Sequence, residues 1–86
     1  MTAKTWLVTG CSSGFGKVLA QALLARGERV AITARQPERL SDLAQAYPET
    51  ALALRLDVTR ADQIDAAVNG AIARFGRIDV LVNNAG

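Results

Sequence analysis

The chain has 86 residues, about enough for one small domain; 50% of them are apolar and 21% are charged. Ten Lys and Arg residues are interspersed with eight Asp and Glu, and the net charge of +2 argues against a nucleic-acid partner, which usually requires a basic stripe. No apolar run approaches the roughly 18 residues of a membrane span. The N-terminal segment has no secretory pattern, so we expect a cytoplasmic protein. A single cysteine and no histidine exclude an internal disulfide and leave no zinc ligand set.

Short apolar runs alternate with longer amphipathic segments along the chain. The first run, residues 5–9, is predicted to be a buried strand. The segment after it repeats apolar side chains every three or four residues, as one face of a helix does, and Gly27 stands where that helix would end. The apolar positions of this face are Phe15, Val18, Leu19, Ala22 and Leu23.

A second strand is predicted over residues 29–34, with a second helix after it. Pro37 suits the first turn of that helix, and Pro48 closes it. Residues 51–58 have leucines at every second position, on one face, and Arg55 on the other face. This pattern favours a third strand with one face less buried, near a sheet edge. The apolar face of the second helix consists of Leu40, Leu43, Ala44 and Tyr47.

A third helix and a fourth strand complete the pattern. Residues 59–62 have the spacing of a capping box, Gly76 is placed to end the helix, and residues 78–83 form the strand. We also expect Trp6 in the core. The apolar face of the helix consists of Ile64, Val68, Ala71, Ile72 and Phe75, the last of which is expected in the core as well.

The order β-α-β-α-β-α-β predicts right-handed crossovers between parallel strands. We therefore expect an α/β fold: the N-terminal half of a Rossmann-type doubly wound parallel sheet, with strand order 3-2-1-4. One partial domain covers residues 1–86, truncated after the fourth strand. A chain that stops there leaves the apolar run 80–82 at an exposed edge, which predicts self-association as a homo-oligomer.

Three glycines stand at the junction of the first strand and the first helix, in the stretch TGCSSGFG. Gly10 permits a sharp turn. Gly14 and Gly16 open the helix without Cβ atoms, so its first amides and the positive end of its dipole stay accessible to an anion. Ser12 and Ser13 add hydroxyl donors or cap the helix. The alternative is a glycine-rich turn that binds nothing.

The spacing T-G-x-x-x-G-x-G, which begins at Thr9, resembles the glycine motif of the short-chain dehydrogenase/reductase family. Two more landmarks of that family follow in the same order: DVT at residues 57–59 and NNAG at residues 83–86. The resemblance covers the whole chain. It implies a nicotinamide dinucleotide cofactor and hydride transfer between that cofactor and a small carbonyl or alcohol substrate.

The tip of the second strand indicates which dinucleotide is expected. In dinucleotide folds an acidic residue there accepts a hydrogen bond from the ribose of NAD, whereas this chain has Ala34 followed by Arg35. Arg35 can offer a bidentate fork to a phosphate, and Arg39 lies one helical turn farther on, so we expect NADP(H) in preference to NAD(H). The alternative is that Arg35 is a solvated surface residue.

The resemblance implies that the Asp57 carboxylate accepts from the adenine amino group while Val58 lines the ring pocket. Asp57 could instead cap the following helix with Thr59, and one residue could do both. Residues 83–86 are implied to line the cofactor and to stabilise the sheet. The residues assigned to cofactor binding are Thr9, Gly10, Ser12, Ser13, Gly14, Phe15, Gly16, Arg35, Asp57, Val58, Asn83, Ala85 and Gly86.

The family's catalytic residues have no match in this chain. The signature Tyr-x-x-x-Lys lies downstream of NNAG, whereas the only tyrosine here is Tyr47, with Ala51 four residues later. Cys11 is interpreted as a small residue filling the glycine loop, with a redox role as the alternative. Two functions stay open. One is the cofactor-binding part of an NADP-dependent short-chain oxidoreductase, inactive as an isolated chain; the other is a non-catalytic NADP-binding regulatory module.

Overall fold

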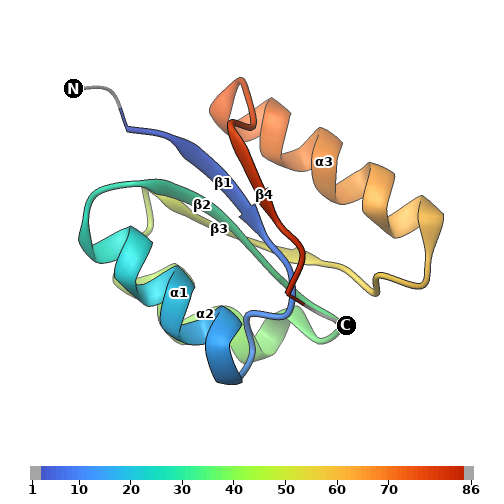
Figure 1. The fold of residues 1–86 in the computed structure, drawn as a ribbon, viewed down its shortest axis with the longest axis horizontal. Coiled ribbons are helices and arrows are strands. Elements are labelled where there is room, and N and C mark those ends of the chain that lie inside the picture. The colour runs from blue at the N-terminus through green and yellow to red at the C-terminus, as the bar shows by residue number, and fades with distance from the viewer. Residues whose placement is uncertain (1–2, 85–86) are drawn as a thin grey trace.

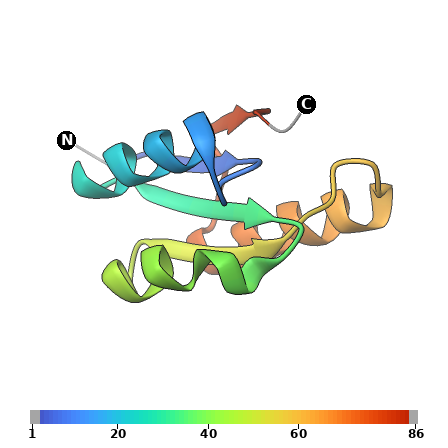
Figure 2. The ribbon, with the colours of Figure 1, turned by 90° about the horizontal axis from the view of Figure 1, so that it is seen from below.

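Four parallel strands alternate with helices in the computed structural model, which describes residues 3–84 (Figure 1). The strands form one sheet in the order β3-β2-β1-β4, which confirms the predicted topology (Figure 2). Along the chain the elements are β1 (Thr5–Val8), α1 (Gly14–Ala25), β2 (Arg29–Ala34), the 3-10 helix η1 (Pro37–Leu40), α2 (Ser41–Ala46), β3 (Ala51–Arg55), α3 (Ala61–Phe75) and β4 (Val80–Val82).

The sheet lies between two layers of helices. α1 and α2 cover one face and α3 covers the other (Figure 1). β2 is buried over nearly its whole length, which explains its mostly apolar sequence, because a strand covered on both faces has little contact with water. Val30 and Ile32 pack toward α1 and α2, whereas Ala31 packs toward α3, so alternate residues of one strand belong to two cores.

The predicted apolar face of α1 is partly wrong. Phe15 and Val18 are 64% and 62% exposed. The helix is rotated so that Gly16, rather than a larger side chain, lies against the loop after β1, and this lets the helix backbone come close to the sheet. The buried residues of α1 are Gly16, Ala20, Leu23 and Leu24.

The apolar face of α3 is likewise shifted from the prediction. Its buried residues are Ala71, as predicted, and Ala67, which was not predicted. Gly70 also lies near the sheet, since a Cβ there would be 3.3 Å from Leu54 Cδ2. Small residues thus bring this helix close to the sheet, and Val68 packs partly against the core. The exposed members of the predicted face are Ile64 and Ile72.

The helix ends follow the sequence in part. Gly27 and Gly76 end α1 and α3 with φ of 88° and 86°, as predicted, since glycine tolerates the left-handed conformation. The capping box predicted over residues 59–62 is wrong: α3 begins at Ala61, and the Arg60 side chain before it makes no capping bond. The Thr59 amide and hydroxyl are instead engaged by a carboxylate two residues earlier. In the described part of the chain, no helix has the length and hydropathy needed to cross a membrane.

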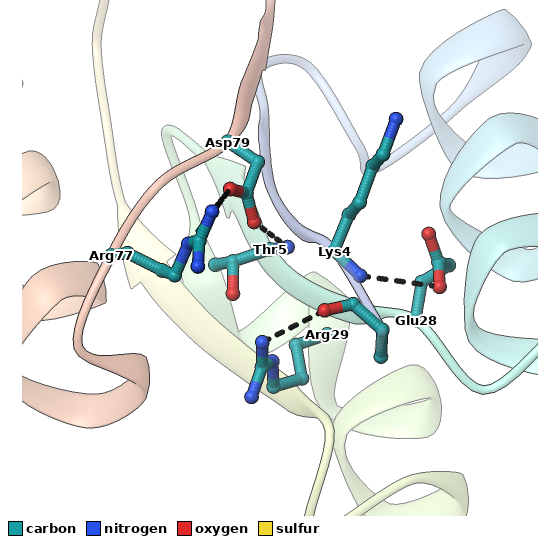
Figure 3. Close-up of polar contacts among 7 residues, drawn as sticks. Lys4, Thr5, Glu28, Arg29, Arg77 and Asp79 are labelled. Carbon is teal, nitrogen blue, oxygen red and sulfur yellow. Dashed lines mark hydrogen bonds and ion pairs between the residues drawn. The ribbon is translucent and has the colours of Figure 1, made fainter. Parts of the chain in front are cut away.

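Polar contacts tie the amino ends of the strands together (Figure 3). The Asp79 carboxylate, just before β4, accepts from the Thr5 amide of β1 at 2.8 Å and pairs with the Arg77 guanidinium. Arg29, the first residue of β2, donates to the Ala3 carbonyl at 2.9 Å. Because the strands are parallel, these contacts lie at the edge of the sheet opposite the glycine loop.

Candidate functional site

A hollow of about 470 Å³ lies at the carboxyl edge of the sheet. Its walls are the glycine loop, the first turn of α1, the tip of β2, the segment between β3 and α3, and one residue after β4. In open α/β sheets this crevice is where ligands bind. The predicted residues that line it are Gly10, Ser12, Ser13, Gly14, Phe15, Arg35, Asp57 and Val58.

The glycine loop is held in place by β2. The Cys11 amide donates to the Thr33 carbonyl at 2.8 Å, and the Thr33 hydroxyl donates to the Val8 carbonyl at 2.9 Å. Gly10 and Gly14 have φ of 68° and 62°, where a side chain would be strained. The two glycines therefore let the backbone turn back over the end of the sheet and enter α1.

Gly16 brings α1 against this loop. A Cβ at Gly16 would lie 2.2 Å from the Gly10 carbonyl oxygen and 2.7 Å from the Asn84 side-chain nitrogen. That Asn84 amide donates to the same carbonyl at 3.4 Å. Close packing of α1, the loop and the segment after β4 thus requires glycine at position 16.

The first turn of α1 is open to a ligand. Ser13, at the N-cap, is extended and makes no side-chain capping bond, and no acidic residue lies in the first turn. Apart from its chain neighbours and the backbone of its own helix, no atom of the described residues comes within 4 Å of the place where a Gly14 Cβ would stand. The first amides of a helix need partners, and the positive end of its dipole favours an anion. The arrangement fits the pyrophosphate of a dinucleotide.

Asp57 provides a carboxylate on another wall of the hollow. Its Oδ1 accepts from the Thr59 hydroxyl at 2.6 Å and from the Thr59 amide at 2.9 Å. These bonds, with a contribution from the charges of Arg35 and Arg60, lower the pKa of Asp57 below its ordinary value. The backbone amide of Asp57 donates to Gln63 Oε1 at 2.8 Å, which ties the segment to α3. An ionised, positioned carboxylate of this kind can accept from an amino group.

Three predicted residues, Thr9, Gly16 and Asn83, do not line the hollow but support its walls. The Thr9 amide donates to the Val82 carbonyl at 3.0 Å, and its hydroxyl accepts from the Asn84 amide at 2.8 Å, which joins the ends of β1 and β4. Thr9 thus stabilises the sheet at this edge.

Asn84 lines the hollow although it was not among the residues assigned to cofactor binding. The signal for it was the second asparagine of the NNAG motif. Leu56 and Thr59 also line the hollow, and they lie in the segment between β3 and α3 that contains the predicted Asp57. The predicted Ala85 and Gly86 lie outside the described residues.

Cys11 is buried within the glycine loop, and its Sγ lies 3.2 Å from the Val8 carbonyl, to which it donates. Burial raises the pKa of this thiol to about 11. Near neutral pH it is therefore protonated and a weak nucleophile. These properties agree with a packing role and weigh against redox chemistry.

A parallel sheet of this order, with a glycine loop leading into an open helix N-terminus, defines a Rossmann-type dinucleotide-binding domain. The profile of the short chain dehydrogenase family matches residues 4–86, and the chain belongs to this family. Members of this family are oxidoreductases that bind a nicotinamide dinucleotide.

Known proteins agree with this assignment. A solved short-chain dehydrogenase from Streptomyces avermitilis has 55% sequence identity and a TM-score of 0.93, over 99% of this chain and 31% of that one. A 3-ketoacyl-(acyl-carrier-protein) reductase from Brucella melitensis, solved with NADH, has 35% identity and a TM-score of 0.84, over 91% and 32%. The 2-(R)-hydroxypropyl-CoM dehydrogenase of Xanthobacter autotrophicus is 44% identical, over 93% of this chain and 34% of its own length. The chain thus spans about a third of the length of these relatives.

Proposed function

We propose that the chain is the cofactor-binding part of an NADP-dependent short-chain oxidoreductase. Bound NADP(H) would supply or take up the hydride exchanged with a small carbonyl or alcohol substrate. In this proposal residues 1–86 form one partial dinucleotide-binding domain of a cytoplasmic, self-associating enzyme. The chain is inactive alone, because the Tyr-x-x-x-Lys signature has no match in it.

The observation that carries the proposal is that one hollow is lined by the open first turn of α1, by Arg35 and by Asp57. These groups match three parts of the ligand. The amides around Gly14 would hold the pyrophosphate, Arg35 would bind the ribose 2′-phosphate, and Asp57 would accept from the adenine amino group, with Val58 against the adenine ring. Ser12 and Ser13 would add hydroxyl donors, and the segment from Asn83 to Gly86 would line the cofactor.

The preference for NADP(H) rests on the tip of β2. Ala34 has no carboxylate with which to repel a 2′-phosphate, and Arg35, the next residue, also lines the hollow. A hydrogen bond to a charged group contributes about 1.5–3 kcal/mol. One such contact therefore favours NADP over NAD by about ten- to a hundredfold.

A regulatory module that binds NADP without catalysis is the second candidate. It is favoured by the position of the only tyrosine: Tyr47 packs against the core under α1 and α2 and does not line the hollow. The two candidates differ in the sequence of the longer protein. A serine followed by Tyr-x-x-x-Lys in a continuing reading frame would decide for the enzyme.

Calorimetric titration of the purified chain with NADP and NAD tests the cofactor assignment. We expect tighter binding of NADP, a loss of this preference in Arg35→Glu, and no change in Arg26→Glu, an exposed arginine at the end of α1. Equal affinities for both cofactors, unchanged in Arg35→Glu, would disprove the NADP assignment. Measured NADPH turnover by the chain alone would contradict the proposed inactivity.

A further inference from the structure

A second hollow, of about 640 Å³, adjoins the first and is strongly basic. Arg35, Arg39 and Arg55 line it together with Ser12 and Gln36, and no carboxylate is among these lining residues. The three guanidinium groups come from the turn after β2, from η1 and from the last residue of β3. Arg55 is the member that no sequence motif indicates.

The register of the sheet explains why Arg55 joins this group. In the parallel pairing of β2 with β3, Arg55 lies opposite Ala34, the last residue of β2. Residues two apart in a strand share a face, so Arg55 is on the same face as Ala51 and Ala53, which pack toward α1 and α2. Because residue 34 is alanine, no carboxylate stands opposite Arg55 to neutralise it.

The arginines of this hollow form no salt bridge with the residues that the structure describes. Two salt bridges are present within residues 3–84, and neither involves an arginine of the hollow. Arg39 Nε donates to Gln36 Oε1 at 2.8 Å, which orients the guanidinium without neutralising it. Cations that line the same hollow repel one another, and a bound phosphate would offset that repulsion with charge-assisted, bidentate hydrogen bonds.

We propose that Arg55, together with Arg35 and Arg39, binds a phosphomonoester on the ribose of the nucleotide and sets the preference for a 2′-phosphorylated cofactor. Ser12 and Arg35 line both hollows, so a ribose substituent reaches the second while the nucleotide occupies the first. The inference rests on the proposed function. It adds a specificity-determining residue that lies outside the glycine, DVT and NNAG motifs.

The test uses two probes that differ by one phosphate, 2′,5′-ADP and 5′-AMP, titrated into the chain by calorimetry. Arg55→Gln is expected to lower the affinity for 2′,5′-ADP about tenfold and to leave that for 5′-AMP unchanged. Arg55→Lys keeps the charge but not the planar fork, so an intermediate preference is expected. Arg26→Gln, which removes an exposed arginine far from the hollow, is the matched control and should change neither affinity.

The dependence of binding on salt concentration distinguishes a contact between Arg55 and the phosphate from a purely structural role of Arg55. The preference for 2′,5′-ADP should fall with ionic strength, and less steeply in Arg55→Gln, which has one cation fewer at the phosphate. If Arg35→Gln abolishes the preference while Arg55→Gln keeps it, the inference fails and the proposed function stands. If the unsubstituted chain binds both probes equally, both fail. Should Arg55→Gln misfold and lose 5′-AMP binding, Arg55→Lys decides, because an undiminished preference there overturns the inference.

Discussion

Replacing Gly16 by alanine tests the packing on which the hollow depends. The new Cβ would stand 2.2 Å from the Gly10 carbonyl oxygen, 2.9 Å from the Gly10 carbonyl carbon and 2.7 Å from the Asn84 amide nitrogen. Two of these three atoms belong to the backbone and cannot rotate away. Ordinary contact needs roughly 3.5 Å, so α1 would have to move by about 1 Å relative to the loop.

Such overpacking costs about 3 kcal/mol, the upper end of the usual range, and is offset by about 1 kcal/mol because alanine favours the helix. We therefore expect Gly16→Ala to lower the free energy of unfolding by about 2 kcal/mol and Tm by about 8–16 °C, measured by circular dichroism.

Gly70→Ala is the matched control for this substitution. Gly70 also lies within a helix, but its new Cβ would meet only the flexible end of Leu54, at 3.3 Å. The helix preference of alanine then dominates, and stability should stay constant or rise by up to about 1 kcal/mol. Equal changes in Tm for the two variants would refute the close approach of α1 to the glycine loop.

Three further outcomes follow from individual side chains. The hydrogen bond from the Thr5 amide is the main cause that lowers the pKa of Asp79 below its ordinary 3.8. The ionised Asp79 carboxylate therefore contributes its full stabilisation above pH 3.8, and this stabilisation is lost as the pH falls through the pKa of Asp79 in the folded protein. Urea unfolding should show Asp79→Asn less stable than wild type near neutral pH, with a difference that shrinks below pH 3.8; a constant difference would contradict this linkage. Cys11, buried and with a pKa raised to about 11, should react with thiol reagents only after unfolding in urea, and fast labelling of the folded chain would show the burial to be wrong. Asp57→Ala should weaken 5′-AMP binding at least tenfold, whereas Thr59→Ala should weaken it much less, because the amide of residue 59 still donates to Asp57. Similar losses in both variants would mean that Asp57 serves only to form the turn with Thr59.

Local patterns were sufficient for the elements and their order. Alternating apolar runs and amphipathic segments predicted four strands, and the helix-ending glycines Gly27 and Gly76 are where they were expected. These features depend on propensities and periodicities that a chain carries along its own length. The glycine loop was predictable for the same reason, because positive φ at Gly10 and Gly14 is a local requirement.

Which side of a helix faces the sheet was decided by packing. The apolar periodicity placed Phe15 and Val18 in the core, yet α1 turns Gly16 inward because the backbone of the loop occupies the space that a side chain would need. In α3 the predicted Ala71 is buried together with Ala67, whereas Ile64 and Ile72 of the predicted face are exposed. The rotation of a helix about its axis depends on the space that neighbouring elements leave free. The sequence of the helix alone does not determine that space.

The composition of the basic hollow likewise came only from tertiary structure. Arg35 was predictable, since it follows the tip of β2 and stands next to a known landmark of dinucleotide folds. Arg55 is 20 positions farther along the chain, and the sequence pattern predicts it only on the less buried face of an edge strand. Parallel pairing with β2 sets it opposite Ala34, and only that register gathers its charge with those of Arg35 and Arg39. Sequence periodicity predicts which face of the sheet a residue occupies. Its neighbours on that face depend on which strand pairs with its own.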